Sequence, residues 1–171
     1  MPEFKGAVTL HGNPLTLVGN EVKVGDAAPD FKALTTALAE ARLSDSKGKV
    51  RVLMTVPSLD TPVCDIEARR FNQEASALGG AVKVLVVSMD LPFAQKRWCA
   101  AASASAVETL SDHRDAAVGQ AYGVLIKELR LLARAVFVIG KDGKVAYKEL
   151  VSEVADEPDY AAALAAVRKL I

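Results

Sequence analysis

The pattern of apolar and polar residues predicts a protein that mixes helices and strands. Two short apolar stretches, Val52–Val56 and Val82–Ser88, have the length and β-branched content of strands that are buried on both faces of a sheet. The residues between them carry a helical pattern. A strand, a helix and a second strand in this order predict a βαβ crossover between parallel neighbours.

A helix is predicted to begin soon after the first of these strands. Pro57 stops the strand because its ring nitrogen has no hydrogen to donate to a neighbouring strand. Thr61 is a favourable N-cap residue, and Pro62 fits the first helical position, where an N–H group would have no partner anyway. Cys64 therefore lies in the first turn of a helix, at a strand-to-helix junction.

The same helix has a predicted buried face. Val63, Ile66 and Phe71 are apolar, and charged side chains stand between them. A helix with one apolar side packs that side against the rest of the protein. We therefore expect these three residues to face the core.

Turn residues and periodicity divide the rest of the chain into further elements. The clearest is a β-hairpin whose strands, 133–139 and 144–151, are joined by the turn Gly140–Gly143. The other predicted elements are an N-terminal β-hairpin over about 6–19, a loop over 24–31, extended structure over Lys32–Leu38, a helix over Phe93–Ala102, a short strand over 107–110, a short helix over 115–122 and a terminal helix over 159–170.

This order of elements predicts an α/β fold with a central mixed β-sheet flanked by helices. The chain has 171 residues, 51% of them hydrophobic and 25% charged, which is ordinary for one globular domain spanning 1–171. A cysteine at a strand-to-helix junction resembles the thioredoxin-like fold. Thioredoxins carry Cys-x-x-Cys at that junction, whereas this chain has Thr61-x-x-Cys64, so dithiol exchange within the motif is excluded.

Charge and composition argue against several classes of function. Lys plus Arg and Asp plus Glu both number 21, so the charge indicates no nucleic-acid or anionic-membrane partner. No apolar run is long enough to span a membrane, and no signal-peptide pattern is present, so we expect a cytoplasmic protein. His11 and His113 do not share zinc-like spacing with the two cysteines, and we expect no metal. Two cysteines in such a chain point to redox chemistry.

The predicted position of Cys64 favours a thiolate. The first turn of a helix offers unpaired N–H groups and the positive end of the helix dipole, which lower a cysteine pKa from its free value of about 8.5. Asp65 and Glu67 act in the opposite direction, although Arg69 can pair with Asp65 across one helical turn. The alternative is that Cys64 is an inert, packed core residue, which is common for cysteine.

The segment around Cys64 also carries a family signature. Pro57, Thr61 and Cys64 fit the pattern Pro-x-x-x-Thr-x-x-Cys of the peroxiredoxins, and the chain more narrowly resembles the bacterial thiol peroxidases, their atypical two-cysteine branch. The stretches that carry the resemblance are Gly12–Pro14, Val24–Phe31, Pro57–Asn72, Ser88–Gln95 with Cys99, Gln120–Gly123 and Leu132–Ala135.

The resemblance implies a role for four residues around one sulfur. Cys64 would attack a hydroperoxide as a thiolate and become a sulfenic acid. Thr61 would hydrogen-bond the thiolate and the peroxide, Pro57 would shield the sulfur from water, and Arg134 would hold the thiolate and polarise the peroxide. Without the resemblance, Arg134 would be interpreted as part of a surface ion pair.

The resemblance also implies how the enzyme is recycled. Cys99 would attack the sulfenic acid and form an intramolecular disulfide with Cys64, and thioredoxin would reduce it, with no metal, flavin or haem. The alternative for Cys99 is a packed residue beside Trp98. Because the cysteines lie on separate predicted helices, we expect both helices to loosen on oxidation. Members of the family form homodimers, which we also expect here.

Two other functions remain open on the sequence. One is a peroxide-sensing thiol–disulfide relay that turns over slowly and passes oxidation to a partner. The other is a non-catalytic thioredoxin-like binding module, in which Cys64 and Cys99 are only packed.

Overall fold

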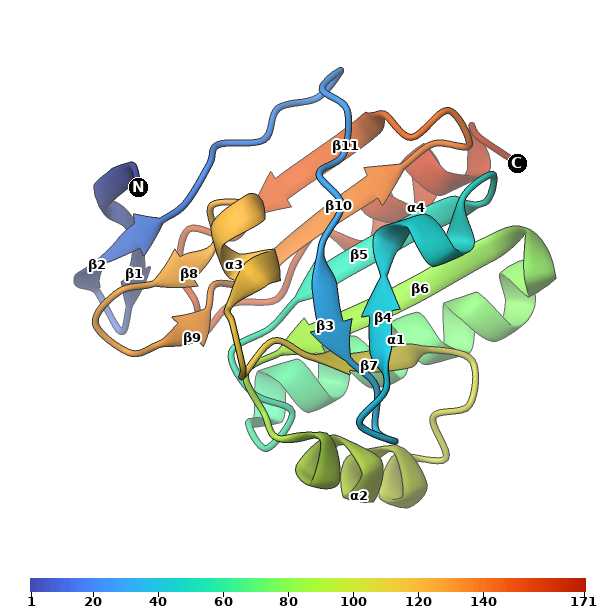
Figure 1. The fold of residues 1–171 in the computed structure, drawn as a ribbon, viewed down its shortest axis with the longest axis horizontal. Helices are drawn as coiled ribbons and strands as arrows, with labels where there is room; N and C mark the ends of the chain where they lie inside the picture. The colour runs from blue at the N-terminus through green and yellow to red at the C-terminus, as the bar shows by residue number, and fades with distance from the viewer.

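A seven-stranded mixed sheet forms the centre of the computed structural model, which describes residues 1–171 (Figure 1). The strand order is β11-β10-β5-β6-β7-β3-β4. β5 pairs in parallel with β6, and β6 with β7, which confirms the predicted crossover. The strands are β3 (Lys32–Leu34), β4 (Glu40–Arg42), β5 (Val50–Thr55), β6 (Val82–Ser88), β7 (Glu108–Ser111), β10 (Ala135–Ile139) and β11 (Val145–Leu150).

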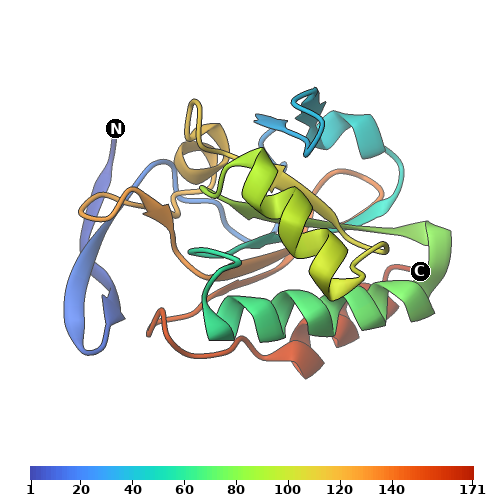
Figure 2. The same cartoon turned by 90° about the horizontal axis from the view of Figure 1, so that it is seen from below.

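Two helices, α1 (Pro62–Leu78) and α4 (Tyr160–Arg168), lie side by side on one face of this sheet (Figure 2). Successive side chains of β5 point to opposite faces of the sheet. Val52 and Met54 join the hydrophobic core under these helices, whereas Leu53 joins the core on the opposite face. α2 (Pro92–Ala102) lies beside β7, and α3 (Ala117–Ala121) contacts β3 on the opposite face. The helix predictions are therefore confirmed, with shorter bounds for α3 and α4.

A second sheet of four strands, in the order β1-β2-β8-β9, covers part of that opposite face. Its first two strands, β1 (Glu3–Leu10) and β2 (Asn13–Val18), confirm the N-terminal hairpin predicted over about 6–19. Its last two, β8 (Leu125–Ile126) and β9 (Leu131–Leu132), were not predicted, because strands of two residues have no periodicity to detect. Pairing of β2 with β8 joins the hairpin to the segment that leads to β10.

The extended structure predicted over Lys32–Leu38 is only partly confirmed. β3 ends at Leu34, and the Thr35 hydroxyl then accepts hydrogen bonds from the backbone N–H groups of Ala37 and Ala39. Leu38 has a φ of +65°, so the chain reverses there and returns as β4. Local side-chain bonding to the backbone thus ends the strand earlier than its composition suggests.

The buried face of α1 differs from the predicted one. Phe71 is buried, but Ile66 is 52% exposed. The buried positions are Cys64, Glu67, Ala68, Phe71 and Ala75, a stripe at helical spacing that contains one charged residue and not the expected isoleucine. None of the helices is both long and apolar enough to cross a membrane.

Substitution of Phe71 and Ile66 by alanine tests which face of α1 is buried. Phe71→Ala is expected to lower the free energy of unfolding by about 3–5 kcal/mol, because it empties a core site beside Tyr160. Ile66→Ala is expected to change it by less than about 0.5 kcal/mol. Urea unfolding of both variants measures these changes. Similar losses of unfolding free energy in the two variants would support the buried face of α1 that the sequence predicts.

Candidate active site around Cys64

Cys64 occupies the first turn of α1 and is completely buried. Its thiol is free, and Nη2 of Arg134 donates to its sulfur at 3.4 Å. Arg134 directly precedes β10, which pairs with β5, the strand that leads into the Cys64 loop. The sheet therefore brings together two residues that are 70 positions apart in the chain.

Arg134 is only 2% exposed, and all of its hydrogen bonds stay inside the protein. Nη1 forms an ion pair with Oε2 of Glu67 at 2.5 Å, while Nε and Nη2 both donate to the Val154 carbonyl at 3.1 and 2.9 Å. The fork of the guanidinium is thus fixed in place by an acid on α1 and by a backbone oxygen. The surface ion pair considered as an alternative for Arg134 is wrong.

Glu67 is the site residue that the sequence analysis missed. In the sequence Glu67 is only a negative charge near Cys64, whereas in the structure its side chain is completely buried and binds Arg134. Burial raises the pKa of Glu67 to about 7, and the adjacent Arg134 opposes this shift. Its other oxygen, Oε1, has no hydrogen-bond partner. Its spacing of three residues from Cys64, on the same helix face, was the available signal.

Thr61 takes the expected N-cap position, but its hydroxyl neither caps the helix nor bonds the sulfur. The hydroxyl donates to the Ser58 carbonyl at 2.8 Å. The expectation that Thr61 hydrogen-bonds Cys64 is therefore not met in this arrangement. Pro57 is buried, as the shielding role requires, while Thr61 is exposed.

A cavity of about 380 Å³ lies beside these residues, and Pro57, Thr61 and Arg134 all line it. The rest of its wall is mainly apolar and comes from the second sheet and its turns, the start of α1 and the loop after β11; it comprises Leu10, His11, Pro62, Val63, Ile126, Leu129, Leu131, Val154 and Ala155. His11 was expected to be a solvated turn residue, and it is an exposed turn residue that also forms part of this wall.

The N-terminal hairpin supports Arg134 through the loop that contains Val154. The Glu153 carboxylate accepts hydrogen bonds from the Thr9 hydroxyl and from the backbone N–H groups of His11 and Gly12. These bonds hold the pKa of Glu153 at about 2. The backbone of Thr9 pairs with the same loop, because its carbonyl accepts from the Val154 N–H. The hairpin thereby fixes the carbonyl that binds Arg134.

The structure does not bring Cys99 to Cys64. Cys99 is half-buried on α2, its thiol is free, and its sulfur lies 3.4 Å from the Thr109 hydroxyl on β7. It lines a different cavity, of about 410 Å³, which also includes Thr35 and Lys83. The Cys64 sulfur therefore contacts Arg134, whereas the Cys99 sulfur lies against Thr109 of β7.

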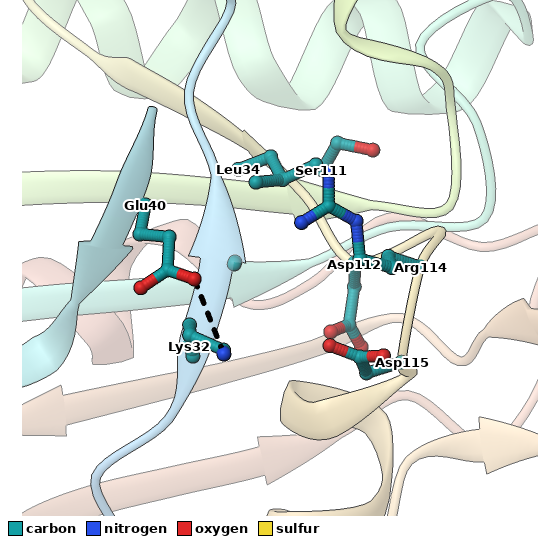
Figure 3. A pocket seen from close by; sticks show the side chains of 8 residues that line it. Lys32, Leu34, Glu40, Ser111, Asp112, Arg114 and Asp115 are labelled. Atoms are coloured by element: carbon teal, nitrogen blue, oxygen red, sulfur yellow. Dashed lines mark ion pairs between the residues drawn. The ribbon is translucent and has the colours of Figure 1, made fainter. Parts of the chain in front are cut away.

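A third pocket, between β3, β4 and the end of β7, offers no comparable chemistry. Lys32 and Glu40 form an ion pair across it at 3.2 Å (Figure 3). The Asp112 carboxylate accepts hydrogen bonds from the backbone N–H groups of Val118 and Gly119 and so stabilises the first turn of α3. No group of three or more His, Cys, Asp or Glu side chains is arranged to hold a metal ion.

Comparison with known proteins places the chain in a well-defined group. The Redoxin family model matches residues 23–164. The chain is 59% identical to the thiol peroxidase of Halalkalibacterium halodurans over 95% of this chain and 97% of that protein. It is 56% identical to the thiol peroxidase of Bacillus subtilis over 96% and 98%. A peroxiredoxin-like protein from Aquifex aeolicus superposes with a TM-score of 0.91 at 48% identity, covering 97% and 98%. These matches confirm the predicted thioredoxin-like α/β fold.

The raised pKa of Glu67 predicts how the stability of the protein depends on pH. With an ordinary value of 4.5 and a folded value of about 7, Glu67 binds more protons in the folded state between these limits. Its contribution is therefore complete below pH 4.5 and is lost as pH rises through about 7. Urea unfolding across this range should show a decline that Glu67→Gln removes and that Glu74→Gln, which removes a partly exposed carboxylate paired with Arg70, retains. An unchanged decline in Glu67→Gln would contradict the assignment.

Proposed function

The chain belongs to the thiol peroxidases of the Redoxin family, and from this premise we propose that Cys64 is the sulfur that reduces hydroperoxides. One observation carries the proposal: a buried guanidinium, that of Arg134, donates to the Cys64 sulfur at 3.4 Å. A fixed cation beside a thiol at a helix N-terminus stabilises the thiolate, which is the nucleophilic form. A merely packed cysteine does not need this arrangement.

In the proposed reaction, the Cys64 thiolate attacks the distal oxygen of a hydroperoxide. The S–O bond forms as the O–O bond breaks, the sulfur is oxidised to a sulfenic acid, and the leaving alkoxide or hydroxide takes a proton to give an alcohol or water. Negative charge is spread over the sulfur and both oxygens in the transition state. Arg134, already held by Glu67 and Val154, can stabilise this charge without reorganising.

Thr61 and Pro57 take supporting roles in this proposal. The Thr61 hydroxyl would turn from the Ser58 carbonyl to the sulfur and the peroxide when substrate enters, a rotation about one side-chain bond. Pro57, which is buried at the edge of the cavity, keeps water from the thiolate. The apolar wall formed by residues such as Val63, Leu129 and Leu131 supports alkyl hydroperoxides as substrates in addition to hydrogen peroxide.

Cys99 is proposed to resolve the oxidised enzyme. Its thiolate would attack the sulfenic sulfur of Cys64, forming the S–S bond as the S–O bond breaks, and the leaving hydroxide would take a proton from solvent to give water. A thioredoxin would then reduce the disulfide. A disulfide needs Cα atoms within about 7 Å, and the Cys64 sulfur contacts Arg134 while the Cys99 sulfur lies against Thr109. In this proposal α1 and α2 therefore open before the disulfide forms. Thioredoxin as reductant and a homodimeric state are proposed from membership of the family.

A coupled assay with thioredoxin, its reductase and NADPH tests the two-cysteine cycle. Peroxide-dependent loss of NADPH is expected for the wild type and should vanish in Cys64→Ser, because the attacking sulfur is gone. Cys99→Ser should consume one equivalent of peroxide but lose thioredoxin-linked turnover. Sustained turnover in Cys99→Ser would imply another resolving thiol, and no turnover in the wild type with any hydroperoxide would favour the binding module.

Conservative replacement of Arg134 tests its electrostatic role. Arg134→Lys keeps the charge but loses the fork, so kcat/KM for peroxide is expected to fall about 100-fold, as on loss of one oxyanion-hole donor. Arg70→Gln, which removes an exposed arginine of α1, should leave kcat/KM unchanged. The double variant Arg134→Gln/Glu67→Gln removes both charges and so avoids a buried, unpaired carboxylate. Wild-type activity in either Arg134 variant would exclude the proposed role.

A further inference from the structure

One side-chain hydrogen bond joins the two helices that carry the cysteines. The indole Nε1 of Trp98 donates to Oδ1 of Asp65 at 2.8 Å. Asp65 directly follows Cys64, and Trp98 directly precedes Cys99. The bond therefore links the immediate neighbours of the two cysteines, although the Cys64 sulfur contacts Arg134 and the Cys99 sulfur contacts Thr109.

The contact is well anchored on both sides. Trp98 is 8% exposed and belongs to the hydrophobic cluster that contains Cys64 and Phe71. Asp65 also accepts from Nε of Arg69, one turn further along α1, at 2.8 Å. Its carboxylate is thus held at the orientation that the indole requires, and a hydrogen bond to a charged acceptor is stronger than one between neutral groups.

The other polar contacts of α2 itself go to the central sheet and its loops, and the segment after α2 is tied to α1 further along, where the Ala106 N–H donates to Oδ1 of Asn72 at 2.9 Å. Near the start of α2, Gln95 donates to Ser88 and to the Leu110 carbonyl, both on the central sheet. Asp90, just before the helix, accepts from the loop that precedes Cys64. Between α1 and α2 themselves, the Trp98–Asp65 pair is the one hydrogen bond.

We propose that the Asp65–Trp98 hydrogen bond is a latch that holds the closed, peroxide-reactive arrangement and sets the rate at which Cys99 reaches oxidised Cys64. The inference rests on the proposed two-cysteine function. For the disulfide to form, the first turn of α1 and the Cys99 end of α2 must loosen. Neither can move away from the other without breaking this bond. Asp65 and Trp98 are thus positioning residues, which contact neither the peroxide nor the sulfurs.

The latch governs a competition for the sulfenic acid. Once formed on Cys64, the sulfenic acid either reacts with Cys99 to give the disulfide and water, or reacts with a second hydroperoxide. In the second case the sulfur gains another oxygen and becomes sulfinic acid, while the hydroperoxide is reduced to alcohol or water. Slow opening favours the second outcome at high peroxide, so the strength of the latch determines how much peroxide the enzyme tolerates.

A double-mutant cycle tests the latch on the full-length chain. Asp65→Ala removes the acceptor, Trp98→Phe removes the donor but keeps an aromatic ring, and Asp65→Asn keeps an acceptor oxygen. Arg69→Ala is the matched control, because it removes the ion pair of Asp65 but leaves the indole contact. Rapid quenching followed by mass spectrometry measures sulfenic acid, disulfide and sulfinic acid with cumene hydroperoxide as the probe.

Asp65→Ala and Trp98→Phe are each expected to form the disulfide about ten-fold faster than the wild type, the effect of losing one hydrogen bond to a charged group. Both should need correspondingly more peroxide for sulfinic acid. The first oxidation step should be unchanged in Trp98→Phe, which leaves the charges around Cys64 as they are. The double variant should be no faster than either single one. Asp65→Asn, whose neutral oxygen makes a weaker bond, should fall between Asp65→Ala and the wild type, and Arg69→Ala, which keeps the charged acceptor, should be closest to the wild type.

Two results would overturn the latch. Disulfide formation at the wild-type rate in Asp65→Ala and Trp98→Phe, or slower, would show that the contact does not restrain opening. Additive effects in the double variant would show that the residues act separately. A wild-type chain that gains neither sulfenic acid nor disulfide would instead contradict the proposed function itself, and with it the latch.

Discussion

The site depends on how the protein accommodates one buried cation. A guanidinium removed from water is costly unless its charge is paired and its donors are bonded, and Arg134 is only 2% exposed. Glu67 supplies the charge, the Val154 carbonyl accepts two of the N–H groups, and the remaining contact is the Cys64 sulfur. The sulfur thus completes the environment of the cation, and a thiolate there would add the negative charge that Glu67 loses when it is protonated. Because burial raises the pKa of Glu67 to about 7, the balance of charge around the sulfur changes near neutral pH.

Several separate elements of the fold supply the groups that surround the Arg134 guanidinium. Arg134 directly precedes β10 and lies just beyond the end of the paired strand β5. The helix α1 places Cys64 and Glu67 on one buried side, where both contact Arg134. The loop after β11 supplies Val154, and the N-terminal hairpin fixes that loop through the Glu153 carboxylate. The hairpin therefore contributes to the site although it carries none of the reacting groups. Segments from both ends of the chain must be in place before the guanidinium is fixed.

Periodicity in the sequence predicted most of the elements, whereas side-chain contacts within the site were less accessible. The strands around Val52–Val56 and the hairpin from 133 to 151 have long, unambiguous patterns, and the structure has them. Hydrophobicity misassigned the face of α1, because Ile66 is apolar but exposed and Glu67 is charged but buried. The burial of the Glu67 carboxylate can be explained only when its partner is known. That partner, Arg134, lies 67 positions away in the sequence. The resemblance to the peroxiredoxins brought Pro57, Thr61 and Arg134 together, but not the Thr61 hydroxyl bond to Ser58, which depends on local geometry.

In the proposed cycle, one buried cluster holds Cys64 in a closed site, which opens before Cys99 reacts. Hydrogen–deuterium exchange of the reduced and the peroxide-oxidised protein, resolved by mass spectrometry, tests this most directly. In the proposed cycle, oxidation takes the Cys64 sulfur from its contact with Arg134 and joins it to the Cys99 sulfur, which lies against Thr109. We predict that backbone protection falls in the first turn of α1 and in α2 while the central strands β5, β6 and β10 keep theirs. A Cys64–Cys99 disulfide with equal protection of both helices in the two forms would show that the disulfide forms without opening of α1 and α2.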